Sequence, residues 1–147
     1  MSFFTVILEL ACHADADYRK RFCAHLLGKA EVMRLRRQYD DYFDNLDKYM
    51  FSDMVVPEAK AEYLRTLFQN IDGRFYQNFK EQLDELATGV VSMHPSDSTI
   101  LTCVGSYYYS TGRYPEAKEH LGRNKSLYPD SYSATVLYAQ LLSYSGD

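Results

Sequence analysis

The sequence predicts an all-α protein, and three observations point to this class. Apolar residues recur at every third or fourth position along nearly the whole chain, which is the period of an amphipathic helix. Only 7 Gly and 4 Pro occur among 147 residues, too few for the many turns of an all-β chain. Alternation of apolar and polar residues, the sign of a strand, is approached only over residues 99–104 and is short there.

Helices joined by short turns are expected. The first covers the apolar run at the start of the chain, and the second begins where Asp15 or Asp17 can cap it, because a short carboxylate accepts bonds from first-turn amides. A third covers residues 39–50, and Pro57 suits the first turn of the next, where its missing N–H costs nothing. The residues expected on the buried faces of the first three are Phe4, Ile7, Leu8, Ala11; Tyr18, Phe22, Leu26, Ala30, Met33; and Tyr39, Phe43, Leu46, Met50.

The second half of the chain is divided by turn residues. Asn, Ile, Asp and Gly at 70–73 form a turn, and the helix that follows ends before Pro95, because the residue preceding proline avoids helical dihedrals. Asp97 or Ser98 caps a helix that runs to Ser110. Residues 111–113 turn the chain into a helix over 114–128, and a last helix covers 131–145.

Charge differs sharply between the second helix and the third segment. Basic residues crowd the former and aspartates the latter, namely Arg19, Lys20, Arg21, Lys29, Arg34, Arg36 and Arg37 against Asp40, Asp41, Asp44 and Asp47. The basic helix could bind nucleic acid or an acidic partner, or two antiparallel helices joined at Gln38 could place opposite charges side by side. We favour the hairpin, because the net charge of −4 lacks the positive excess that phosphate-backbone binding needs. Such surface pairs contribute only about 0–1 kcal/mol each.

A 34-residue period appears in the last third of the chain. The pairs Gly105 and Ala139, Tyr108 and Leu142, Gly112 and Gly146, and Pro95 and Pro129 each lie 34 residues apart. Residues 98–130 resemble the tetratricopeptide repeat, a helix–turn–helix of this length. The resemblance implies that Gly105 lies where two helices cross, Tyr108 fills the seam, Gly112 forms the turn, Ala117 is a second small contact and Pro129 ends the unit. Asn124, where the family usually has alanine, and the nearby Gly122 predict a loosened second helix.

The resemblance implies a single domain over residues 1–147, a right-handed superhelix of antiparallel helix pairs of the tetratricopeptide α-solenoid type. Residues 98–131 would be the clear repeat and 132–147 the first helix of a truncated one. Residues 56–97 would be a degenerate repeat and 3–55 a degenerate helical hairpin region. The chain is similar to bacterial multi-repeat proteins of the cell envelope. An unpaired last helix predicts a fragment of a longer array, or self-association through that helix.

This resemblance implies a protein- or peptide-binding scaffold and not an enzyme. Its first helices would line a concave groove, with Thr102, Ser106, Tyr109 and Ser110 facing it in one unit and Val136, Gln140 and Tyr144 in the next. Tyr109 is weighed equally as a packing residue between units. Chaperone-tail binders of the family hold a carboxylate with lysines and asparagines, and the hydroxyls on these faces disfavour that role. A regulatory domain of a larger enzyme or signalling protein is the alternative.

The sequence lacks recognisable catalytic and metal-binding motifs. No glycine-rich phosphate loop, nucleophile elbow or metal-ligand spacing occurs, so no cofactor or metal is expected. Cys12, Cys23 and Cys103 are too scattered for a disulfide framework or a zinc knuckle. An enzyme acting through Arg36 and Asp40 is the least favoured reading, since nothing converges there. The expected partner is a protein or peptide segment, without nucleic acid or direct membrane insertion, and the compartment stays open between cytoplasm and periplasm.

Overall fold

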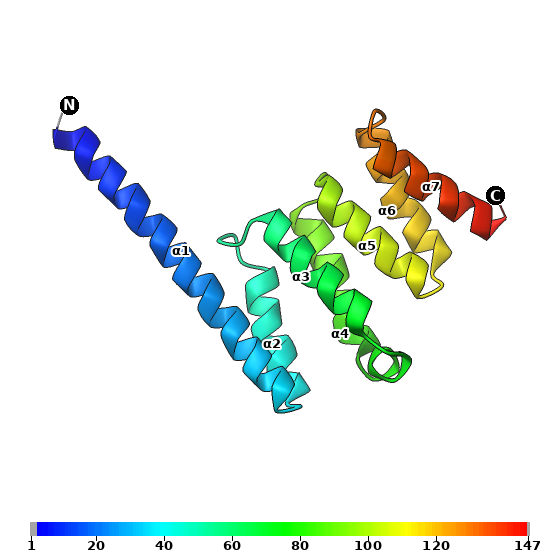
Figure 1. Ribbon diagram of the computed structural model, residues 1–147, viewed down its shortest axis with the longest axis horizontal. Coiled ribbons are helices and arrows are strands. Elements are labelled where there is room, and N and C mark those ends of the chain that lie inside the picture. Colours follow the sequence, from blue (N-terminus) through cyan, green and yellow to red (C-terminus); the bar gives the residue numbers. More distant parts are fainter. Residues whose placement is uncertain (1–2, 147) are drawn as a thin grey trace. The chain divides into compact units, whose positions relative to one another are not determined.

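The computed structural model describes residues 3–146, with side chains from residue 16 onward, and their regular structure is entirely helical (Figure 1). This confirms the predicted all-α class. Where the sequence predicts one domain, the backbone forms two compact units, Met1–Val55 and Val56–Asp147. The helices are α1 Phe3–Leu35, α2 Tyr39–Met50, α3 Pro57–Asn70, α4 Gly73–Met93, α5 Ser98–Ser110, α6 Tyr114–Leu127 and α7 Tyr132–Ser145.

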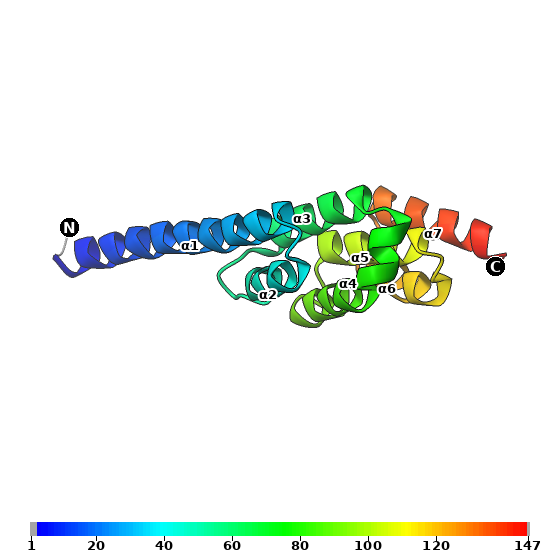
Figure 2. The same ribbon diagram turned by 90° about the horizontal axis from the view of Figure 1, so that it is seen from below.

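The first unit is an antiparallel hairpin of α1 and α2, as the charge pattern and the turn at Gln38 predict (Figures 1 and 2). Leu26 and Ala30 of the predicted stripe are buried, whereas Tyr18 at its start is 57% exposed. The facing side of α2 contributes the buried residues Tyr42, Phe43, Leu46, Tyr49 and Met50. The core of this unit therefore comes from large side chains of α2 together with Leu26 and Ala30 of α1.

One prediction for this unit is wrong. The first two expected helices are a single continuous helix, α1, so neither Asp15 nor Asp17 is an N-cap. The junction between the two predicted stripes contains no glycine or proline, and its alanines at 14 and 16 favour helix more strongly than any other residue. The earlier predicted stripe at Phe4, Ile7, Leu8 and Ala11 lies outside the residues whose side chains are described.

In the second unit, α5 and α6 form a close antiparallel pair, and α7 packs against α6. A Cβ atom added to Gly105 would lie 2.5 Å from Leu121 Cδ2, so any larger residue would force the buried Leu121 side chain to move where the two helices cross. Ala117 is fully buried and Tyr108 is 6% exposed. In the view of Figure 2, α3 and α7 lie on one side of this unit and α4 and α6 on the other.

The ends of these helices follow the predicted signals. Pro57 lies in the first turn of α3. Asp97, and not Ser98, caps α5, because its side chain accepts a hydrogen bond from the Ile100 amide at 3.0 Å. Gly112 has a φ of 78°, which is left-handed backbone that favours glycine in the turn before α6.

The predicted loosening of α6 is also wrong. The helix is continuous through Asn124, whose side chain is 1% exposed. Ser98 Oγ donates to Asn124 Oδ1 at 2.8 Å, and Asn124 Nδ2 donates to Thr102 Oγ1 at 3.0 Å. At Gly122 an added Cβ would come within 3.3 Å of the Tyr138 ring of α7. Both residues that suggested a defect therefore make specific contacts with neighbouring helices.

Candidate binding pocket between helices α3 and α5

Helices α3 and α5 pack side by side and run in the same direction. Cys103 Sγ of α5 donates to the Ala61 carbonyl oxygen of α3 at 3.6 Å. Further along both helices, the rings of Phe68 and Tyr107 stack with centroids 4.1 Å apart. Residue numbers rise together in these two contacts, which shows that the helices are parallel. The first turns of α3 and α5 therefore lie at one end of the pair and their last turns at the other.

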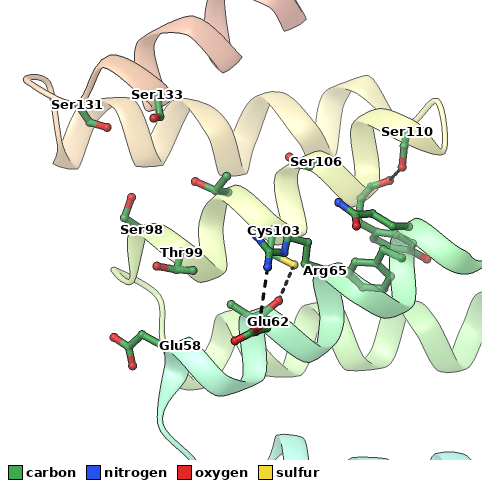
Figure 3. Close-up of a pocket in the computed structure, with 15 residues that line it drawn as sticks. Glu58, Glu62, Arg65, Ser98, Thr99, Cys103, Ser106, Ser110, Ser131 and Ser133 are labelled. Carbon is green, nitrogen blue, oxygen red and sulfur yellow. Dashed lines mark hydrogen bonds and ion pairs between the residues drawn. The ribbon is translucent and has the colours of Figure 1, made fainter.

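A pocket of about 910 Å³ lies along this pair. This volume is at the upper end of the range for small-molecule sites. In Figure 3 the labelled hydroxyl residues lie on α5 and at the start of α7, and Glu58 and Glu62 lie on the neighbouring helix α3. Its lining residues are Glu58, Ala61, Glu62, Arg65, Phe68 and Gln69 of α3; Ser98, Thr99, Thr102, Cys103, Ser106, Tyr107 and Ser110 of α5; and Ser131 and Ser133 at the start of α7.

Three of the predicted site residues, Thr102, Ser106 and Ser110, line the pocket. The other four, Tyr109, Val136, Gln140 and Tyr144, are not among its lining residues. The ring of Tyr109 instead makes edge contacts with Tyr114 at 5.8 Å and with Tyr144 at 6.0 Å. These contacts agree with the packing role that is one of the two options for Tyr109, and a role in binding stays a prediction. Val136 is half-buried, and the Gln140 and Tyr144 side chains are exposed on α7.

The α3 wall was missed by sequence reasoning. Glu58, Glu62, Arg65 and Gln69 follow one another at intervals of four, three and four residues, which places them on one helix face. That spacing was readable in the sequence. It does not by itself identify the face that meets α5, because residues 56–97 show no clear 34-residue pattern from which a register could be taken.

Of the charged residues that line the pocket, two form a weak ion pair with each other and the third has no partner among the described residues. Glu62 and Arg65 approach to 4.0 Å, and both side chains are more than 60% exposed, so this pair contributes little. Glu58 is exposed in the first turn of α3 and has no ion-pair or hydrogen-bond partner among the described residues. The lining residues therefore carry an acidic excess, and it lies toward the end formed by the first turns of the two helices.

The hydroxyl groups fall into two sets. Ser98 and Thr102 are engaged with the buried amide of Asn124, and Ser110 Oγ donates to the Tyr107 carbonyl at 3.0 Å. A second set, Thr99, Ser106 and Ser133, has no hydrogen-bond partner among the described residues. Because a hydroxyl can both donate and accept, this second set can pair with either kind of polar group on a ligand.

The thiol of Cys103 does not add a nucleophile to the pocket. Burial raises its pKa to about 12, with a smaller opposing effect from the positive charge of Arg65. At neutral pH the group is therefore a protonated thiol that donates to the Ala61 carbonyl, and the thiolate is the reactive form of cysteine. Its role here is that of a small, weakly polar wall residue.

An ion-pair and aromatic network holds the far end of α5 in place. Arg113 donates to both carboxylate oxygens of Asp84 at 2.7 Å, and Tyr107 Oη donates to Asp84 Oδ1 at 2.8 Å. The guanidinium lies 4.7 Å from the centroid of the Tyr108 ring. Burial, followed by the hydrogen bond to Asp84, raises the pKa of Tyr107. The network joins α4 to the turn after α5 and thereby positions the aromatic end of the pocket. Its partners are 29 residues apart and were not predicted.

Comparisons with known proteins give no assignment. The chain matches no protein-family model, no curated protein and no solved structure. Among residues 3–146, none of the helices combines the length and the apolar character needed to cross a membrane. The pocket between α3 and α5 is therefore the feature that bears most directly on function.

Proposed function

We propose that this protein is a non-enzymatic scaffold of the tetratricopeptide type that binds an extended segment of another protein in the pocket between α3 and α5. In this proposal the second unit is part of a right-handed superhelix of helix pairs, with α3, α5 and α7 as the successive first helices. The observation that carries the proposal is the pocket between two parallel helices, lined by free hydroxyl groups along its length and by stacked aromatic rings toward one end.

The packing of α5 on α6 supports the repeat assignment. Gly105 allows the close helix crossing, Ala117 is fully buried and Gly112 adopts the left-handed turn conformation. These are the roles that the resemblance assigns to those positions. The parallel arrangement of α3 and α5, with α4 returning the chain between them, is also the order expected of successive helix pairs.

The chemistry of the pocket favours a peptide segment as the ligand. From Ser98 to Ser110 helix α5 spans about 18 Å at 1.5 Å per residue, which corresponds to five or six residues of extended chain. An extended segment presents N–H and C=O groups that lack partners. The hydroxyls of Thr99, Ser106 and Ser133 can bond to both kinds of group. The Phe68 and Tyr107 rings offer an apolar contact for one side chain.

A selection from a phage-displayed library of random peptides on the immobilised full chain tests this proposal. We expect an enriched family of peptides whose binding is at least about ten-fold weaker for Ser106→Trp, because an indole placed at this position fills the pocket. The matched control is Ser126→Trp, at an exposed position of α6 outside the pocket, which should bind with unchanged affinity.

Circular dichroism of both variants establishes that they keep the helical content of the native chain. Two results would contradict the proposal. One is the absence of any enriched peptide. The other is a set of peptides that Ser106→Trp binds as tightly as the native protein does.

A further inference from the structure

The two ends of the α3–α5 pocket differ in chemistry. At the end formed by the first turns, Glu58 lies near the hydroxyls of Ser98 and Thr99 (Figure 3). At the other end, the stacked rings of Phe68 and Tyr107 lie in the last turns. One end is therefore acidic and polar, and the other is aromatic and neutral.

The carboxylates at the acidic end make few direct contacts with other charged side chains. Glu58 has no ion-pair partner among the described residues, and Glu62 shares only a long, exposed contact with Arg65. The N-termini of α3 and α5 each contribute about half a positive charge at this end. The carboxylate of Asp97, which caps α5, offsets that of its own helix. The buried Lys60 in the first turn of α3 adds a positive charge below this surface, so the feature open to a ligand is the exposed Glu58 carboxylate itself, which can pair with a cation.

The spacing of the two ends sets the length of a matching ligand. Glu58 and Phe68 are ten residues apart on one helix, which is about 15 Å along its axis. An extended chain covers that distance in four to five residues at about 3.3 Å each. A single short segment can therefore reach both ends at once.

Resting on the proposed function, we infer that the bound segment carries a lysine or arginine beside Glu58 and an apolar or aromatic side chain about four residues away, against Phe68. The cation pairs with the exposed Glu58 carboxylate, which has no ion-pair partner among the described residues. The apolar side chain covers the exposed part of the aromatic stack. The hydroxyls between the two ends bond to the intervening backbone and select no particular side chain.

Two fluorescein-labelled peptide pairs test this inference on the full chain. They are Lys-Ala-Ser-Ala-Phe and its reverse, Phe-Ala-Ser-Ala-Lys, each compared with the same peptide in which glutamine replaces lysine. Fluorescence anisotropy at 20 mM NaCl should show the lysine member of at least one pair binding about two- to five-fold more tightly, the range of a solvent-exposed ion pair. The preference should shrink at 200 mM NaCl, because salt screens exposed charges.

The variant Glu58→Gln should abolish the preference for lysine while the glutamine peptides bind as before. Glu116→Gln is the matched control, because Glu116 also follows a proline in the first turn of a helix and lies outside the pocket. This control should keep the full preference.

Equal binding of the lysine and glutamine peptides, or a preference that survives in Glu58→Gln, overturns the inference. So does the absence of measurable binding by both pairs. The proposed function has a separate criterion. If Ser106→Trp still blocks peptides from the display selection, the pocket is a binding site that does not select for charge.

Discussion

The hairpins α1–α2 and α5–α6 end their first helices with the same turn but build it from different residues. In each, two backbone hydrogen bonds close the helix end in the Schellman pattern. The residue whose amide donates the first of these bonds has left-handed backbone. The bonds run from Arg37 N to Arg34 O and Gln38 N to Met33 O in one hairpin, and from Gly112 N to Tyr109 O and Arg113 N to Tyr108 O in the other. The left-handed residue is Arg37, with a φ of 59°, in the first and Gly112, with a φ of 78°, in the second.

The two hairpins also bring their helices together differently. Gly105 and Ala117 let α5 and α6 cross closely, whereas in the described part of α1 and α2 one small residue, Ala30, is buried among large ones such as Leu26 and Tyr42. The comparison teaches that a helical hairpin with this turn can form with a recognisable set of small residues at the helix crossing or without such a set. Only the former leaves a pattern that can be read in the sequence.

The largest expected effect comes from the crossing point of α5 and α6. Gly105→Ala should lower the free energy of unfolding by about 1–3 kcal/mol, because the new methyl group would overlap the Leu121 side chain. Gly28→Ala in α1 is the control. An added Cβ there meets nothing within 4 Å, so alanine should stabilise that helix by about 0.5–1 kcal/mol. Urea unfolding followed by circular dichroism measures both, and a neutral Gly105→Ala would refute the close crossing.

High pH should weaken the second unit through Cys103. Burial raises the pKa of this thiol to about 12 from an ordinary value of 9.0, so above pH 9 the unfolded chain loses a proton that the folded chain keeps. The free energy of unfolding therefore falls as the pH rises from 9 to 12, and the loss due to this thiol is about 1 kcal/mol at pH 10. Cys103→Ser cannot titrate in this range and keeps a donor to the Ala61 carbonyl. Its loss of stability between pH 8 and pH 10 should be smaller than that of the native chain, and an equal loss would contradict this account.

Substitution of the left-handed residue should change the free energy of unfolding in opposite directions at the two turns. Gly112→Ala is expected to lower the free energy of unfolding by about 1 kcal/mol, because a side chain is strained in left-handed backbone. Arg37→Gly should raise it by about 0.5 kcal/mol, since relief of strain is partly offset by the greater entropy of glycine in the unfolded chain. Thermal denaturation of the two variants provides the comparison. Changes of the same sign would show that the turns are not equivalent.

The smallest difference is expected between the two buried asparagines. Asn124 in α6 bonds to Ser98 and Thr102 of α5, whereas Asn45 in α2 donates to the Asp41 carbonyl of its own helix at 2.8 Å. Asn124→Ala should lower the free energy of unfolding by about 1 kcal/mol. Asn45→Ala should lower it by about half as much, because alanine's helix propensity offsets the lost bond. The order of the two values in urea unfolding is decisive, and a larger effect at Asn45 would argue against Asn124 as a link between helices.

The sequence was most informative where turn residues interrupt it. Pro57, Pro95 and Gly112 located the boundaries of the later helices. Thr102 and Ser106, which the 34-residue period assigns to a groove, line the pocket, while the groove itself stays a prediction. Where no such residue occurs, as between the two predicted stripes of α1, the expected break was wrong. Hydrophobic periodicity alone cannot tell two helices in line from one long helix.

The remaining features depend on tertiary structure. The bidentate pair of Arg113 with Asp84 joins residues 29 apart, and no local pattern marks such partners. The acidic wall of α3 had a readable spacing, but its choice as the face toward α5 follows from packing at Ala61 and Phe68. Asn124 was misjudged because a buried polar residue is tolerated only when its hydrogen bonds are satisfied. The sequence alone did not identify Ser98 and Thr102 as its partners.

Binding of a peptide segment between α3 and α5 is tested most directly by amide chemical-shift mapping of the full ¹⁵N-labelled chain with a peptide from the display selection. The account predicts that the largest shift changes fall on residues that line the pocket from both helices, among them Ala61, Arg65, Thr102 and Ser106. Shift changes confined to the exposed face of α7 around Gln140 and Tyr144, or to the α1–α2 hairpin, would contradict it.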